Sequence, residues 1–136
     1  MIRQLMMLAL CAPVLLGAQT LQVKTGAWET TSKSPSLPRP LIVKDCVTKA
    51  DVAQLAGGPD KDDDDECKLV AGPSVVGNKW TADKKCGDGR KVHAEFVAET
   101  PEKVVGTIVS TAPKGGSGIR IELSSRWLGA SCAGIK

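Results

Sequence analysis

Hydrophobic and polar residues alternate along much of this chain. The alternation is most regular over residues 118–128, and a second stretch of the same kind covers residues 90–99. A period of two places successive side chains on opposite faces of a strand, so each stretch predicts a β-strand with one packed face and one face in water. In the first stretch the apolar side carries Ile119, Ile121, Leu123, Ser125 and Trp127, and the polar side carries Arg120, Glu122, Ser124 and Arg126.

Turn-forming residues divide the chain into short elements. Three prolines fall within residues 34–40, and Gly77-Asn78 is a two-residue hairpin signal. One short helix is expected over residues 48–56, because Thr48 and Asp51 have the capping-box spacing. Strands are predicted at residues 26–33, 41–47, 67–76, 79–86, 90–99, 103–111 and 118–128.

Short turns between successive strands are typical of a mainly β fold. We expect an antiparallel meander that forms a curved sheet, either a partly closed barrel or a sandwich, with one short helix. Residues 19–136 show neither an internal repeat nor a second composition, so they are predicted to form a single domain.

The first eighteen residues have the features of a secretory signal peptide. Arg3 precedes an unbroken apolar run from Leu5 to Leu16, and Gly17-Ala18 offers a small-residue cleavage site. A helix of that run rises about 18 Å, too little to cross a hydrocarbon core of about 30 Å. We therefore expect export to the periplasm, with no transmembrane segment in the mature chain. Cys11 lies within the run and is expected to leave with it.

The charge balance of the mature chain is close to neutral. The sequence has 18 Lys and Arg residues against 15 acidic ones, and cleavage that removes Arg3 reduces the excess from three to two. Without a large field of one sign, neither nucleic acid nor an anionic membrane surface is favoured as a partner. We expect a monomer.

Four cysteines remain after the predicted signal: Cys46, Cys67, Cys86 and Cys132. An even number in an exported chain predicts disulfide bonds, and the absence of a close CxxC pair argues against zinc or thiol redox chemistry. Three pairings are possible. We favour Cys46 with Cys67, and Cys86 with Cys132.

Several of these features together resemble a bacterial family described only as domain of unknown function thirty-six seventeen. The similarity rests on Gly26-Ala27-Trp28-Glu29, on the four cysteines with Gly77-Asn78 between the middle two, and on the closing run from Ser125 to Cys132. It implies an exported, periplasmic, disulfide-bonded β protein of a Gram-negative bacterium, and it brings no catalytic residues. Family members are often rich in Met after the first strand, whereas residues 34–40 contain none.

No assembled catalytic, metal or cofactor site is predicted. Asp60, Asp62 and Asp64 match the start of a calcium loop, but Asp65 occupies the required glycine position and Ala71 that of the bidentate glutamate. His93 is the only histidine, and the alternation of its segment places it on the polar face of a strand. We therefore expect no catalytic residue, metal or cofactor.

The function predicted from the sequence is a non-catalytic binding module for a small apolar ligand, an envelope component or a partner protein. Trp28, Trp80 and Trp127 are either core residues, which is the commoner role, or the lining of an apolar pocket. One alternative is an enzyme with a dispersed site around His93, using Glu95 or Glu122. Another is an inhibitor or interaction protein that acts through exposed loops.

Overall fold

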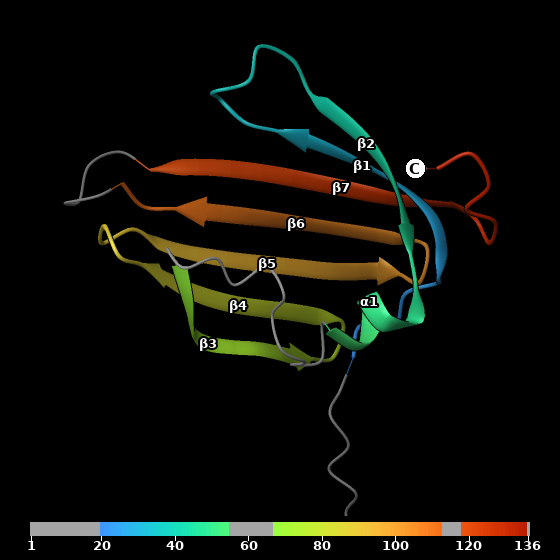
Figure 1. Ribbon diagram of the computed structural model, residues 1–136, viewed down its shortest axis with the longest axis horizontal. Coiled ribbons are helices and arrows are strands. Elements are labelled where there is room, and N and C mark those ends of the chain that lie inside the picture. Colours follow the sequence, from blue (N-terminus) through green and yellow to red (C-terminus); the bar gives the residue numbers. More distant parts are fainter. Residues whose placement is uncertain (1–19, 55–66, 113–117, 136) are drawn as a thin grey trace, which may run out of the picture.

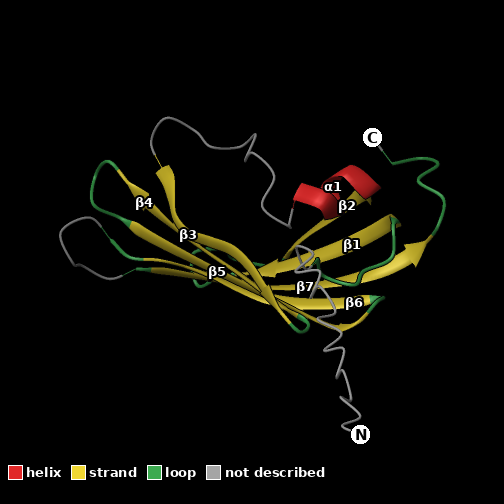
Figure 2. Cartoon of the chain, turned by 90° about the horizontal axis from the view of Figure 1, so that it is seen from below, coloured by secondary structure: helices red, strands yellow, loops and turns green. Residues whose placement is uncertain are grey.

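The structure is a computed structural model that describes residues 20–54, 67–112 and 118–135. Within these ranges seven antiparallel strands form one open, twisted sheet with one short helix beside it (Figures 1 and 2). The predicted signal peptide and the acidic run of residues 60–66 lie outside the described residues.

The strand boundaries follow the predicted pattern closely, and four strands match it to the residue. The helix begins at Lys49, and the last two residues of its predicted range, 55 and 56, lie outside the described residues. Its start is fixed by a capping box in which the Thr48 amide donates to Asp51 (2.7 Å) and the Asp51 amide donates to the Thr48 hydroxyl (3.3 Å). The elements are β1 (Gly26–Lys33), β2 (Leu41–Val47), α1 (Lys49–Gln54), β3 (Cys67–Val76), β4 (Lys79–Cys86), β5 (Lys91–Thr100), β6 (Lys103–Ser110) and β7 (Ile119–Gly129).

The strand order is β2-β1-β7-β6-β5-β4-β3. Strands β3 to β7 form a meander of successive hairpins, and the β1–β2 hairpin is added to β7 at the far side. The expectation of a curved antiparallel sheet with one short helix is therefore confirmed. The two edge strands, β2 and β3, do not pair with each other, so the described strands form neither a partly closed barrel nor a sandwich.

The two faces of the sheet differ in chemistry. Directly opposite residues in an antiparallel pair point to the same side, so the strand register assigns each residue to a face. The apolar face carries Trp28, Val43, Trp80, Phe96, Val104, Ile121 and Leu123. The polar face carries Glu29, Lys79, Asp83, His93, Glu95, Glu122 and Arg126.

The buried core is small because a single sheet leaves much of each face in contact with solvent. Most large side chains of the apolar face are only half-buried. Among the described residues, the buried hydrophobic ones are Leu21, Ala27, Trp28, Ala82, Cys86 and Ala98.

The segment before β1 packs against the sheet at the end where Trp28 lies. The Lys24 amide donates to the Pro101 carbonyl in the β5–β6 turn (2.9 Å), and the Trp28 indole donates to the Lys24 carbonyl (2.8 Å). Leu21 is consequently 3% exposed and Trp28 is 5% exposed. Two of the buried hydrophobic residues of the described chain therefore lie at this end of the sheet.

The disulfides are Cys46–Cys132 and Cys67–Cys86. The pairing favoured from the sequence is wrong, and the strand register explains why. Cys67 lies directly opposite Cys86 in the β3–β4 ladder. Cys46 belongs to the β1–β2 hairpin, and because β1 also pairs with β7, this hairpin lies beside the segment that contains Cys132.

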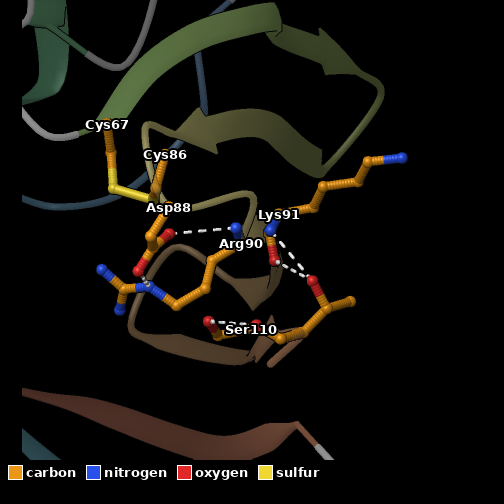
Figure 3. A network of polar contacts seen from close by, with 7 residues as sticks. Cys67, Cys86, Asp88, Arg90, Lys91 and Ser110 are labelled. Carbon is orange, nitrogen blue, oxygen red and sulfur yellow. Dashed lines mark hydrogen bonds and ion pairs between the residues drawn. A yellow bond between two sulfur atoms is a disulfide. The ribbon is translucent and has the colours of Figure 1, made fainter. Parts of the chain in front are cut away.

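The turn after Cys86 is held by local hydrogen bonds (Figure 3). The Asp88 carboxylate accepts from the Arg90 amide (3.0 Å) and from the Arg90 side-chain Nε (2.7 Å). The hydrogen bond from the Arg90 amide is the main reason why the pKa of Asp88 lies below its ordinary value. This turn leads from β4 into β5, at the end of the β3–β4 hairpin that the Cys67–Cys86 disulfide closes.

Candidate functional site

The apolar face contains an open pocket of about 230 Å³. It lies where the N-terminal segment meets the sheet, and most of its surface is contributed by aliphatic and aromatic side chains. Residues from five strands contribute to it, although β2 and β5 are separated in the sheet by three other strands. The lining residues are Leu21, Val23, Trp28, Thr30, Asp45, Val47, Phe96, Val104 and Ser125.

The position of Phe96 in this pocket depends on a glycine in the neighbouring strand. Phe96 lies opposite Gly106, and a Cβ atom on Gly106 would collide with the Phe96 ring. The ring therefore lies across β6 in space that any other residue at position 106 would occupy. On its other side it packs against Trp80, with ring centroids 5.4 Å apart and an interplanar angle of 46°. This pair supports the wall of the pocket from β4 and β5.

Most polar groups at the pocket form hydrogen bonds within the protein. The Trp28 indole N–H is bound to the Lys24 carbonyl, which leaves the hydrocarbon surface of the ring to the pocket. The Thr30 and Ser125 hydroxyls are 2.7 Å apart and bond to each other across β1 and β7. The Asp45 side chain, from edge strand β2, adds a carboxylate to the lining. The pocket is thus an apolar depression with one acidic group.

The three tryptophans do not form a single pocket. Trp28 is both core and pocket wall, while Trp80 contributes through its contact with Phe96. Trp127 lies opposite Trp28 in the ladder, and Lys24 covers it with Nζ 4.5 Å from the ring centroid. Its indole N–H donates to the Thr25 carbonyl (3.1 Å). Trp127 therefore anchors the segment before β1.

The sequence analysis did not single out Phe96, Val104 or Leu21 as pocket residues. Phe96 was recognisable as the largest member of the alternating apolar set in β5. No periodic signal marks Leu21, because it precedes the first strand and is buried only through the crossing of its segment over the sheet.

The polar face holds a wider groove, of about 580 Å³, across β1, β7, β6 and β5. Its floor contains the cross-strand row Lys33, Glu122, Thr107 and Glu95, in which the Thr107 hydroxyl separates the two carboxylates. This row brings Glu95 and Glu122 to one surface, with β6 between their strands. The groove is larger than the apolar pocket, and its charged and hydroxyl side chains share the lining with Val97 and Val105.

His93 lies beside this groove between two carboxylates. Its Nδ1 donates to Asp83 Oδ1 (2.7 Å), and its Nε2 is 3.8 Å from Glu95 Oε2. Lys79 forms an ion pair with Glu95 at 3.2 Å. General-base catalysis requires a proton donor within reach of the histidine, and in the described ranges no hydroxyl or thiol is hydrogen-bonded to His93.

A family model described as "Protein of unknown function (DUF3617)" matches residues 23–132. The chain belongs to this family. The resemblance inferred from the sequence is thereby confirmed, and the family carries no assigned activity. Searches of curated proteins and of solved structures found no match.

The match to the DUF3617 family covers both disulfides and nearly the whole apolar pocket. Of the nine lining residues, only Leu21 lies before the matched range. Residues 20–54, 67–112 and 118–135 contain no group of three or more His, Cys, Asp or Glu side chains arranged to hold a metal ion. Over the same residues, no helix has the length and hydropathy needed to span a bilayer.

Proposed function

We propose that this chain is an exported, periplasmic binding module without catalytic activity, which holds an apolar group in the pocket on the apolar face of its sheet. The observation that carries the proposal is the composition of that pocket. Trp28, Phe96 and Val104 present hydrocarbon surface to it, and the Trp28 indole N–H is already bonded within the protein. Apolar surface arranged in this way gains free energy when a ligand removes it from water.

The volume limits what the pocket can hold. A cavity of about 150 Å³ accepts a benzene-sized molecule, and drug-sized ligands need about 300 Å³ or more. At about 230 Å³, the pocket suits a single ring or a short aliphatic segment. The rest of a larger ligand would extend along the open apolar face, towards Ile121 and Leu123.

Two features support the assignment to the periplasm. The cysteines pair within the fold as Cys46–Cys132 and Cys67–Cys86, and such bonds persist in oxidising compartments. The apolar run that follows Arg3 has the length of the apolar region of a signal peptide. Both agree with a binding role in the cell envelope, where apolar molecules must pass through water.

The test is a fluorescence titration of the oxidised mature protein with N-phenyl-1-naphthylamine, an uncharged aromatic probe. We expect saturable binding that Val104→Asp weakens by about tenfold or more, because the new carboxylate faces the pocket. Val109→Asp is the matched control. It lies on the same strand but on the polar face, opposite His93, and should leave the affinity within about twofold.

Circular dichroism of both variants establishes that each retains the sheet. Equal loss of probe binding in the two variants, or no saturable binding by the wild-type protein, would refute the pocket as the binding site. Binding of a charged analogue with the same affinity would argue for the polar groove instead.

A further inference from the structure

Charged side chains on the polar face are arranged in rows that run across the strands. Directly opposite residues of an antiparallel pair share a face, and their Cβ atoms lie about 4.5–5.5 Å apart. Three of these rows each contain at least one carboxylate among their basic groups. They are Lys44, Glu29, Arg126 and Lys103; Lys33, Glu122, Thr107 and Glu95; and Arg120, Val109, His93 and Asp83.

The row where the Cys67–Cys86 disulfide closes the β3–β4 hairpin contains only basic groups. The register places Lys68 opposite Lys85, and Lys85 opposite Lys91, so lysines from three neighbouring strands lie side by side. All three are exposed, and none forms an ion pair with another described residue. By contrast, Arg126 and Lys103, which also face each other, are each paired with a glutamate. Like charges directly opposite each other destabilise a sheet, and a bound anion would remove that cost.

A hollow of about 400 Å³ adjoins the lysine row. Lys85 and Lys91 contribute to its lining, and Val70 and Val109 add aliphatic surface beside them. Figure 3 shows the Lys91 side chain extending away from the ion pair in the neighbouring turn. Positive charge and aliphatic surface therefore meet at one place on the polar face.

We propose that this row and hollow bind a phosphate monoester, with the phosphate held by Lys68, Lys85 and Lys91. A lysine carries a compact charge on a flexible stem, so three of them from neighbouring strands can converge on one group. A phosphate monoester carries close to two negative charges at pH 7 and has three strong acceptor oxygens, whereas a carboxylate carries one charge. The organic part of the ester would lie against Val70 and Val109, where it removes aliphatic surface from water.

The position of Asp83 orients this ligand. Its carboxylate is also part of the lining and is hydrogen-bonded to His93 (2.7 Å). Asp83 and His93 lie two residues along their strands from Lys85 and Lys91, in the next row of the same face. The phosphate is therefore placed at the lysine end of the hollow, and the organic part extends towards Asp83 and His93.

This inference does not depend on the proposed apolar ligand, whose pocket lies on the opposite face of the sheet. The nearly neutral total charge of the chain gives no indication of such a site. Only the register of β3, β4 and β5 brings the three lysines together.

The experiment is isothermal titration calorimetry of the oxidised mature protein with phenyl phosphate at low ionic strength. We expect saturable binding that Lys85→Gln weakens by about fivefold or more, because Lys85 is the central lysine of the row. Lys44→Gln is the matched control. It removes the same charge from the same face, in a row that contains Glu29, and should leave the affinity within about twofold.

The stability of the free protein provides a second readout. Lys85→Gln relieves repulsion between like charges, so its midpoint of urea denaturation in phosphate-free buffer should equal or exceed that of the wild-type protein. A lysine with a merely structural role would lower the midpoint when replaced.

The two proposed sites can be tested separately with variants on opposite faces of β6. Val109→Asp places a carboxylate in the hollow and should abolish phenyl phosphate binding while naphthylamine binding persists. Val104→Asp should have the reverse effect. Loss of both ligands in either variant would overturn the independence of the two sites.

Cosedimentation with phosphatidylcholine vesicles that contain phosphatidic acid distinguishes two sources of the phosphate monoester. Vesicle binding that phenyl phosphate displaces would identify a lipid headgroup, and binding of phenyl phosphate without vesicle binding would identify a soluble ester. The proposal would be overturned by any of three results: no saturable binding of phenyl phosphate up to about 10 mM, equal effects of Lys85→Gln and Lys44→Gln, or a lower urea midpoint for Lys85→Gln.

Discussion

The ring of Phe96 occupies the space above Gly106, on the next strand of the sheet. Aromatic side chains often cover a strand glycine in this way, because the missing side chain leaves a gap in the face of the sheet. Here the arrangement also sets the shape of the apolar pocket, since Phe96 forms one of its walls.

Gly106→Ala should therefore destabilise the protein and reduce binding at the pocket. The added carbon would overlap the Phe96 ring and would lie 2.6 Å from the Glu95 carbonyl oxygen. We expect a loss of about 1–3 kcal/mol in the free energy of unfolding, typical of overpacking, measured by urea denaturation. Affinity for the naphthylamine probe should fall in parallel.

The double variant Gly106→Ala, Phe96→Ala separates the two clashes. If the ring is the main obstacle, Gly106→Ala costs less in the Phe96→Ala background than in the wild-type protein, and the two changes are not additive. Additive effects would assign the whole cost to the backbone contact with Glu95.

The two disulfides should differ in their contributions to stability. Cys46–Cys132 joins residues 86 apart, and Cys67–Cys86 joins residues 19 apart. In the chain-entropy model, replacing the first pair with alanines costs about 4–5 kcal/mol and replacing the second costs about 3 kcal/mol. Urea denaturation of the two double variants measures both. A greater loss from the shorter loop would contradict this model of their action.

The Asp88 carboxyl should titrate below its ordinary pKa of 3.8, chiefly because the Arg90 amide donates to it. A carboxyl whose pKa is lower in the folded state than in the unfolded state stabilises the fold at pH values above its unfolded-state pKa. That contribution is therefore present above about pH 3.8 and is lost as the pH falls through the lower folded-state pKa. Carbon-detected NMR of the Asp88 carboxyl measures the shift directly.

Two variants at Arg90 distinguish the sources of this shift. Arg90→Ala keeps the backbone amide and should leave the pKa of Asp88 depressed. Arg90→Pro removes the N–H and should raise the pKa towards its ordinary value. If Arg90→Ala alone restored that value, the guanidinium rather than the amide would be the main cause.

Mature protein isolated from a bacterial periplasm should contain no free thiol. With both disulfides formed, its mass should be four hydrogens below that of the reduced chain. Native mass spectrometry reads this difference and would also detect a retained ligand. Four free thiols in material from that compartment would contradict the role assigned to the cysteines.

The strands could be predicted from the sequence because their signals are local. Period-two alternation, the prolines of residues 34–40 and the Gly77-Asn78 turn each act over a few residues, and the observed boundaries follow them. The disulfide pairing could not be obtained in this way. It depends on which strand lies beside which, and the docking of the β1–β2 hairpin on β7 is a long-range contact that no local pattern encodes.

The sequence indicated which type of residue could line a pocket, but not which residues lie together in it. The sequence left Trp28 as either a core residue or a pocket residue, and Trp28 is both buried and part of the pocket lining. Leu21 reaches the pocket through the path of its segment across the sheet, and Phe96 reaches it through the absence of a side chain at Gly106. His93 illustrates the same limit, since its neighbour Asp83 comes from an adjacent strand through the β4–β5 register.

The Cys46–Cys132 bond also constrains the order of events in biogenesis. If the chain is exported as proposed, Cys46 would leave the export channel 86 residues ahead of Cys132, so its native partner would become available only after every strand of the sheet had followed. During that interval Cys67 and Cys86 become available as competitors, and they can satisfy each other first across their own hairpin. Formation of the Cys46–Cys132 bond would then indicate that the sheet is complete. A periplasmic oxidase that acted too early would trap chains whose last strand had not yet docked.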